Sequence, residues 1–185
     1  MLLALRRVDV AALCVVALVA GTARMGAAEH HEVRTGAFVV EHELDLPGSP
    51  ETIYDAITGD ISSWWDHSFS EKPARFYIDA RPGGGFYEIF DASGDGVRHA
   101  EVILAQRGKM LRFEGPLGLS GNAIQMVMTY SFEAVGEDST RLELRVHAAG
   151  EMQDRWAEAV DGVWHHFLFE RLKPPYVESG EHLER

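Results

Sequence analysis

The chain has 185 residues, 46% of them hydrophobic and 25% charged, which fits one ordinary soluble domain with a sizeable core. Its formal net charge is -12, from 17 Lys and Arg against 29 Asp and Glu. An acidic chain without a basic cluster repels phosphate backbones and anionic lipid surfaces, so neither is expected as a partner.

The N-terminus predicts an export signal over residues 1–28. A pair of arginines precedes the apolar run VAALCVVALVA, and small residues follow up to a predicted cleavage point after Ala28. The run is shorter than the roughly 20 residues that span a bilayer, although an uncleaved anchor is the alternative. We therefore expect a secreted or periplasmic protein with no stable membrane insertion after removal of the leader. Cys14, the only cysteine, would be removed with the leader. The mature chain would then have no thiolate or disulfide chemistry.

The first elements of the predicted domain are a strand and two short helices. The segment AFVVEHELDLP, residues 37–47, alternates apolar and polar side chains as a half-buried strand does. Ser49 as N-cap and Pro50 at the first helical position predict a short helix. Gly59 ends this helix, and the following DISSWWD predicts a second short turn of helix.

The next part of the chain has the pattern of strands and tight turns. RPGGG is predicted as a hairpin turn whose glycines permit positive φ, and not as a phosphate loop, because no helix follows it. After Gly150, apolar residues recur at helical spacing until Pro174 and Pro175, which predicts a long amphipathic helix. Six strands are expected before that helix, at residues 75–80, 85–90, 97–106, 110–116, 123–135 and 141–149.

This order of elements predicts one α+β domain over residues 37–178, between a polar lead-in at 29–36 and a polar tail at 179–185. We expect a helix-grip fold, in which a curved antiparallel sheet of about seven strands wraps around the long C-terminal helix. The two short helices follow the first strand. The space between sheet and helix can be filled by side chains or remain as a pocket.

Several segments resemble a known family. These are ELDLPGSPETIYDAITGDISSWW, then ARFYIDARPGGGFYEIF, the Thr140–Leu142 triplet and GVWHHFLFERL. In this order, over about residues 38–173, the chain resembles the START-like, Bet v 1-type (SRPBCC) helix-grip superfamily, in the branch related to activators of the Hsp90 ATPase. The resemblance implies the fold. Because that superfamily includes binders of lipids and other small hydrophobic molecules, polyketide cyclases and co-chaperones, it does not select one function.

The candidate site residues lie on the faces that the alternation turns inward. The tandem Trp64 and Trp65 predict either a plug for the end of the core or one wall of a pocket. His42 lies on the apolar face of the first strand, and Glu88 alternates with aromatic residues in a later one. The expected ligand-contacting residues are His42, Trp64, Trp65, Phe86, Glu88, Phe90, Met126, Tyr130, Trp164 and Leu168.

Histidine clusters do not predict a metal centre. His165 and His166 are adjacent, and neighbours on a helix point about 100° apart, so they do not readily chelate one ion. His30 and His31 lie in the polar lead-in, where binding would be adventitious. We expect neither a metal nor another cofactor.

Three functions remain open. The first is binding of a small hydrophobic or aromatic molecule, lipid-like or polyketide-like, through burial of apolar surface worth about 25 cal/mol per Å² before ordering costs. The second is a cyclase or hydratase that uses His42 and Glu88 as a histidine–carboxylate pair. The third is a co-chaperone-like interaction module with a packed interior and an unknown protein partner.

Overall fold

The computed structural model describes residues 30–174, so the predicted leader and polar tail lie outside the described residues. The chain divides into two units, residues 1–32 and residues 33–185, and all helices and strands described below belong to the second. Within the described part, no helix combines the length and apolar character needed to cross a membrane.

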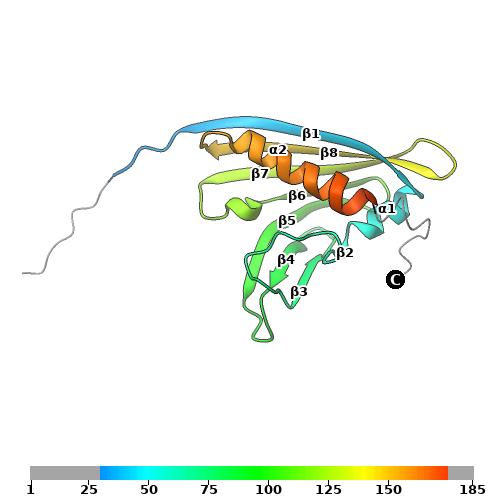
Figure 1. Cartoon of the computed structure of the whole chain (residues 1–185), viewed down its shortest axis with the longest axis horizontal. Coiled ribbons are helices and arrows are strands. Elements are labelled where there is room, and N and C mark those ends of the chain that lie inside the picture. The colour runs from blue at the N-terminus through cyan, green and yellow to red at the C-terminus, as the bar shows by residue number, and fades with distance from the viewer. Residues whose placement is uncertain (1–29, 175–185) are drawn as a thin grey trace, which may run out of the picture. The chain divides into compact units, whose positions relative to one another are not determined.

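An antiparallel sheet of eight strands forms the main layer (Figure 1). Its order is β1-β8-β7-β6-β5-β4-β3-β2, so the first strand lies at an edge beside the last. The strands are β1 (Thr35–Pro47), β2 (Gly59–Asp60), β3 (Arg75–Ile78), β4 (Gly85–Ile89), β5 (Gly96–Gln106), β6 (Met110–Glu114), β7 (Ile124–Ala134) and β8 (Ser139–Glu151). The predicted helix-grip fold is confirmed, with one strand more than expected because the short β2 pairs with β3.

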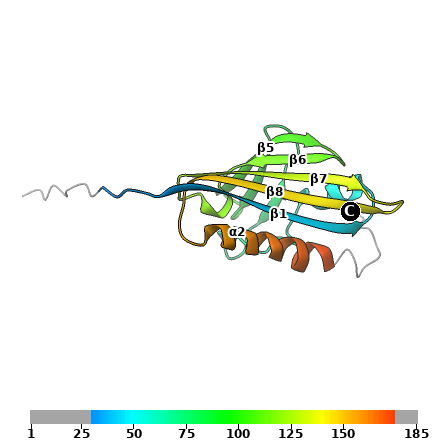
Figure 2. The same cartoon turned by 90° about the horizontal axis from the view of Figure 1, so that it is seen from above.

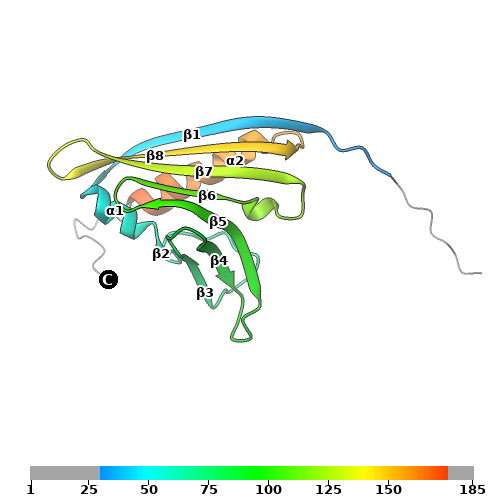
Figure 3. The same cartoon turned by 180° about the vertical axis from the view of Figure 1, so that it is seen from behind.

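The C-terminal helix lies along one face of this sheet (Figure 2). Seen from behind, the sheet stands in front of the helix (Figure 3). The helix consists of α2 (Trp156–His165) and a continuation with π-helical geometry, η2 (His166–Leu172). The other helices are α1 (Pro50–Ala56) and the single 3-10 turn η1 (Leu117–Leu119).

The predicted first short helix forms, and the predicted second one is a single turn. Ser49 Oγ accepts the backbone N–H of Thr52 at 3.2 Å, which caps α1 as expected. After α1, Trp65 N–H donates to the carbonyl of Ile61 at 2.9 Å, but this single turn does not continue as a helix. At the start of this turn, Oδ1 of Asp60 accepts the backbone N–H of Ser62 at 3.0 Å. Such bonds between an Asp side chain and the nearby backbone favour turns over helices.

The strand alternation determines which side chains form the core. In β8, Leu142, Leu144 and Val146 are buried against the helix side, whereas Arg141 and Arg145 pair with acidic residues of β1 on the outer face. Exposed ion pairs of this kind contribute little to stability, so the sheet is stabilised mainly by its buried face. The RPGGG turn joins β3 to β4 with Gly83 at φ 78°, as predicted.

Candidate ligand-binding cavity

A cavity of about 390 Å³ lies between the sheet and the first half of the C-terminal helix. Its walls come from the loop at residues 65–69, from η1, from Met126 on β7, and from the helix face that runs from Trp156 to Phe167. Nearly all of these side chains are apolar or aromatic, and the volume falls in the range of small-molecule sites. The space between sheet and helix is therefore not completely filled.

The tandem tryptophans divide the two predicted roles between them. Trp64 is 3% exposed and packs in the core, with its ring 6.3 Å from that of Phe167. Trp65 is half-buried and borders the cavity. Its indole N–H donates to the carbonyl of His67 at 2.7 Å, and its ring stacks on Phe167 at 3.7 Å. One indole thus closes the core and the other forms a fixed wall.

A buried carboxylate attaches the loop at residues 65–69 to the sheet. Glu88 on β4 is fully buried, and its Oε1 accepts the backbone N–H of Ser70 at 2.8 Å. Its Oε2 accepts the N–H of Phe69 at 3.0 Å and lies 3.1 Å from Nε2 of His99. Both oxygens are therefore used, as burial of a charged group requires.

His99 is the histidine that meets Glu88, and it also borders the cavity. Burial lowers the pKa of His99, because it removes water from the charged imidazolium. The hydrogen bond and charge of Glu88 and a backbone hydrogen bond with Leu117 act in the opposite direction, but burial outweighs them. Sequence alternation missed this pairing for a physical reason. The β4–β5 register shifts between Phe86 and Tyr87, so His99 is the extra residue of a bulge and turns inward.

His42 lies on the inner face of β1, as the alternation predicts, but it is not brought together with Glu88. Its Nε2 lies 3.2 Å from Oδ1 of Asp161 on α2, and its ring is 6.0 Å from that of Phe169. It therefore belongs to the contact between β1 and the C-terminal helix.

The remaining predicted site residues fall into three groups. Met126 and Trp164 border the cavity together with Trp65. Phe90 is half-buried just after β4. The fully buried core beside the cavity contains Phe86, Tyr130 and Leu168, and burial raises the pKa of the Tyr130 hydroxyl, which keeps it neutral.

Two strained backbone positions flank the cavity. Among the described residues, Leu117 and Arg155 are the non-glycine residues with positive φ, at 48° and 64°. Leu117 borders the cavity directly, and Arg155 immediately precedes Trp156, another wall residue. Such conformations cost of the order of 1–3 kcal/mol each and are concentrated at binding sites.

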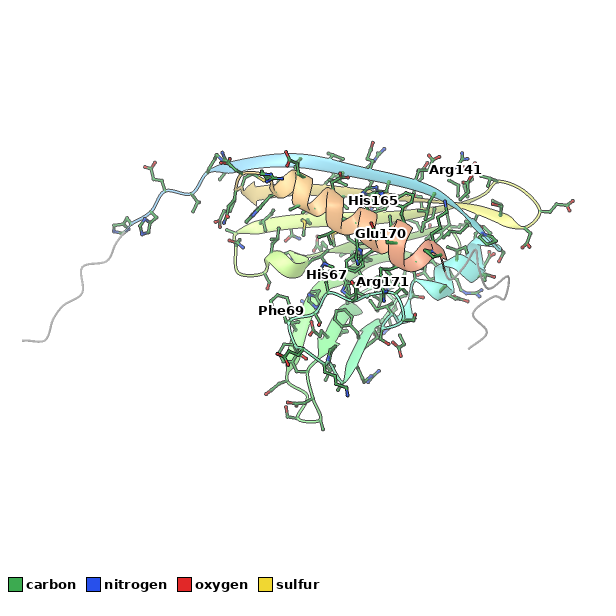
Figure 4. The ribbon with its side chains drawn as sticks, in the orientation of Figure 1. His67, Phe69, Arg141, His165, Glu170 and Arg171 are labelled. Carbon is green, nitrogen blue, oxygen red and sulfur yellow. The ribbon has the colours of Figure 1, made fainter. Side chains whose placement is uncertain are left out.

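A second polar cluster lies where the loop meets the end of the helix. Oδ1 of Asp66 is 2.8 Å from Nδ1 of His67 and 3.1 Å from Nε2 of His166. Nδ1 of His166 is 2.9 Å from Oε2 of Glu170, and Nε of Arg171 is 3.1 Å from Oδ2 of Asp66. Figure 4 shows His67 beside the helix end that carries Glu170 and Arg171.

Hydrogen bonds shift the pKa values of two groups in this cluster. Hydrogen bonds with Glu170 and Asp66 raise the pKa of His166. Burial acts to raise the pKa of Asp66, but hydrogen bonds from His67 and His166 outweigh it and lower that pKa. The sequence could not indicate this cluster, because its two halves are about one hundred residues apart.

The curved sheet, the single long helix and the cavity between them define a helix-grip domain of the START-like (SRPBCC) class. The chain belongs to the Activator of Hsp90 ATPase homolog 1-like family, whose model matches residues 47–174. This confirms the predicted superfamily and branch. No match is found among curated protein sequences.

Solved structures share the fold at low sequence identity. The Aha1 dimer from Colwellia psychrerythraea is 21% identical, with 78% of this chain and 98% of that chain covered and a TM-score of 0.51. Protein MLL2253 from Mesorhizobium loti is 20% identical, with coverages of 74% and 94% and a TM-score of 0.51. A norcoclaurine synthase mutant from Thalictrum flavum, in complex with a transition-state analogue, is 16% identical, with coverages of 81% and 100% and a TM-score of 0.51.

Proposed function

We propose that the protein binds a small hydrophobic or aromatic molecule in the cavity between the sheet and the C-terminal helix. The observation that carries this proposal is the cavity of about 390 Å³ itself, with the indole and phenyl walls of Trp65, Trp164 and Phe167. The complex of the norcoclaurine synthase with a small molecule supports it at the level of the fold.

Apolar burial would supply the affinity. A ligand that buries about 200 Å² of apolar surface gains roughly 5 kcal/mol before the costs of association. Trp65 reduces the ordering part of those costs, because its N–H is already hydrogen-bonded and its ring is already stacked. A flat ligand would therefore meet a rigid wall, with Ser68 and His67 as polar groups on the same side of the cavity.

A second candidate is proton-transfer chemistry, and one observation favours it. His99 borders the cavity and its Nε2 faces the carboxylate of Glu88, which is the arrangement of a histidine–carboxylate pair. However, Glu88 also accepts two backbone N–H groups, so the pair has a structural role in any case. A His99→Gln variant that retains ligand but loses time-dependent conversion of it would favour the enzyme over the binding protein.

The first test is native mass spectrometry of the protein purified from the compartment to which we propose it is exported. We expect an apolar compound at near-unit stoichiometry, identified by denaturation and extraction. An empty protein would shift the proposal toward the third function, the interaction module.

A matched pair of variants tests the location of the ligand. Val160→Phe fills the cavity from α2, whereas Val135→Phe adds the same volume at an exposed position after β7. With the neutral probe N-phenylnaphthylamine, we expect Val160→Phe to weaken binding by about tenfold, equivalent to about 1.4 kcal/mol, and Val135→Phe to leave it unchanged. Equal affinities of the two variants would place the probe outside the cavity and overturn the proposal.

A further inference from the structure

The cluster at the junction of loop and helix brings together three groups that bind metals. Asp66, His67 and His166 each offer one ligand atom within 4.8 Å of the atoms of the other two. Two imidazoles and one carboxylate form a donor set that Zn²⁺ and other divalent transition metals prefer. Adjacent histidines on the helix do not create this set, because only His166 takes part and the second imidazole comes from the loop.

The geometry of His166 matches that of a metal ligand. Its Nδ1 lies 2.9 Å from the carboxylate of Glu170, which directs Nε2 toward Asp66. Such a carboxylate behind a histidine fixes the ring orientation at many metal sites and increases the basicity of the ligand. His166 is also the first residue of η2, and short π-helical segments occur often at functional sites.

Arg171 and the two imidazoles share the carboxylate of Asp66. Nε of Arg171 lies 3.1 Å from Oδ2, Nδ1 of His67 lies 2.8 Å from Oδ1, and Nε2 of His166 lies 3.1 Å from both oxygens. Oδ1 is therefore the oxygen on which both imidazoles converge. The two carboxylates of the cluster also outnumber its one guanidinium. Nε2 of His166 faces the carboxylate of Asp66, and a divalent ion bound to Nε2 would lie between these two groups.

We propose that Oδ1 of Asp66, Nδ1 of His67 and Nε2 of His166 form a binding site for a divalent transition-metal ion of the Zn²⁺ type, with Glu170 as a positioning residue behind His166. The ion would cross-link the loop that walls the cavity to the end of the C-terminal helix. This site shares His67 with the cavity wall, but its three donors come together without an occupied cavity.

The test is a calorimetric titration of the full chain with Zn²⁺ at about pH 8, where unperturbed histidine is neutral. His30→Ala and His31→Ala are introduced in all samples, so that the polar lead-in contributes no imidazole. We expect one ion per chain, and an affinity that falls at least tenfold in His166→Ala and in His67→Ala. His165→Ala is the matched control, because it removes the exposed neighbouring imidazole and leaves the donor set intact.

A spectroscopic measurement distinguishes ligation from loss of fold. In the Cu²⁺-loaded protein we expect electron paramagnetic resonance to show two imidazole nitrogens, and one in His67→Ala. Circular dichroism of each variant checks that it is folded. If His165→Ala weakens Zn²⁺ binding as much as His166→Ala does, or if the parent binds no ion, the site does not exist.

Discussion

Two clusters of histidine and carboxylate attach the same loop, and they do so in opposite surroundings. In the inner pair, Glu88 accepts the backbone N–H groups of Phe69 and Ser70 and contacts His99, and the side chains of Glu88 and His99 are almost completely buried. Asp66 holds the loop against the helix at a position where its own side chain is 37% exposed and that of His166 is 29% exposed. Histidine and carboxylate therefore fix this loop at two places, one in the protein interior and one at the partly exposed edge of the cavity.

The comparison shows that solvent, rather than residue type, determines what such a pair does. Burial lowers the pKa of His99 although Glu88 lies beside it, whereas hydrogen bonds to two carboxylates raise the pKa of the more exposed His166. The inner pair, Glu88 and His99, is buried and both carboxylate oxygens already accept hydrogen bonds, so we interpret it as a structural attachment of the loop. The outer cluster is partly open to solvent, so a cation from solution can reach it.

The largest effect is expected from breaking the inner pair. Glu88→Ala leaves two backbone N–H groups and an imidazole without their buried acceptor, and should lower the free energy of unfolding by about 3–5 kcal/mol. Denaturant unfolding measures this change. Glu43→Ala, at a 57% exposed position of β1, is the control and should stay within about 0.5 kcal/mol of the parent. Similar losses for the two variants would mean that Glu88 does not anchor the loop.

A smaller effect is expected from pH, again through the inner pair. Because the pKa of His99 is lowered in the folded state, the unfolded chain binds more protons between that pKa and the ordinary value of about 6.5. The contribution of His99 to stability is therefore complete above about pH 6.5 and is lost as the pH falls toward its folded pKa. His99→Gln should remove this part of the acid dependence in unfolding experiments, and His147→Gln, on the outer face of β8, should not. A parent with no such difference from His99→Gln would contradict the buried-histidine interpretation.

The smallest effect is expected at the rim, with a chelator present so that no metal contributes. His166→Asn removes interactions with Asp66 and Glu170 that are accessible to solvent, and should shift the denaturation midpoint less than either change above. Near 1 M salt, where the Debye length is about 3 Å, we expect this small shift to decrease further. A shift comparable to that of Glu88→Ala would remove the distinction between the two clusters.

The sequence predicted the parts of the fold that local patterns encode. Alternation located β1 and the later strands, the Ser49 cap located α1, and the helical spacing after Gly150 located the C-terminal helix. The helix end predicted at Pro174 and Pro175 lies at the limit of the described residues. The pairing of the site residues could not be predicted, because it depends on an irregular strand and on contacts between distant parts of the chain. The bulge that turns His99 toward Glu88 breaks the alternation, and Asp66 and His166 meet only after the helix has packed on the sheet. His42 was placed on the correct face but paired with the wrong partner, because alternation says nothing about which element covers that face.

The position of β1 at the edge of the sheet also affects the time course of folding. Within the described residues its only strand partner is β8, with Thr35 opposite Glu151 and Pro47 opposite Ser139. The first strand that leaves the ribosome therefore has no partner until nearly the whole domain has been synthesised. Pairings between such distant segments are slow to form. β1 can cover this edge of β8 only late in synthesis, and such late long-range pairings lengthen the time in which a chain is exposed to aggregation.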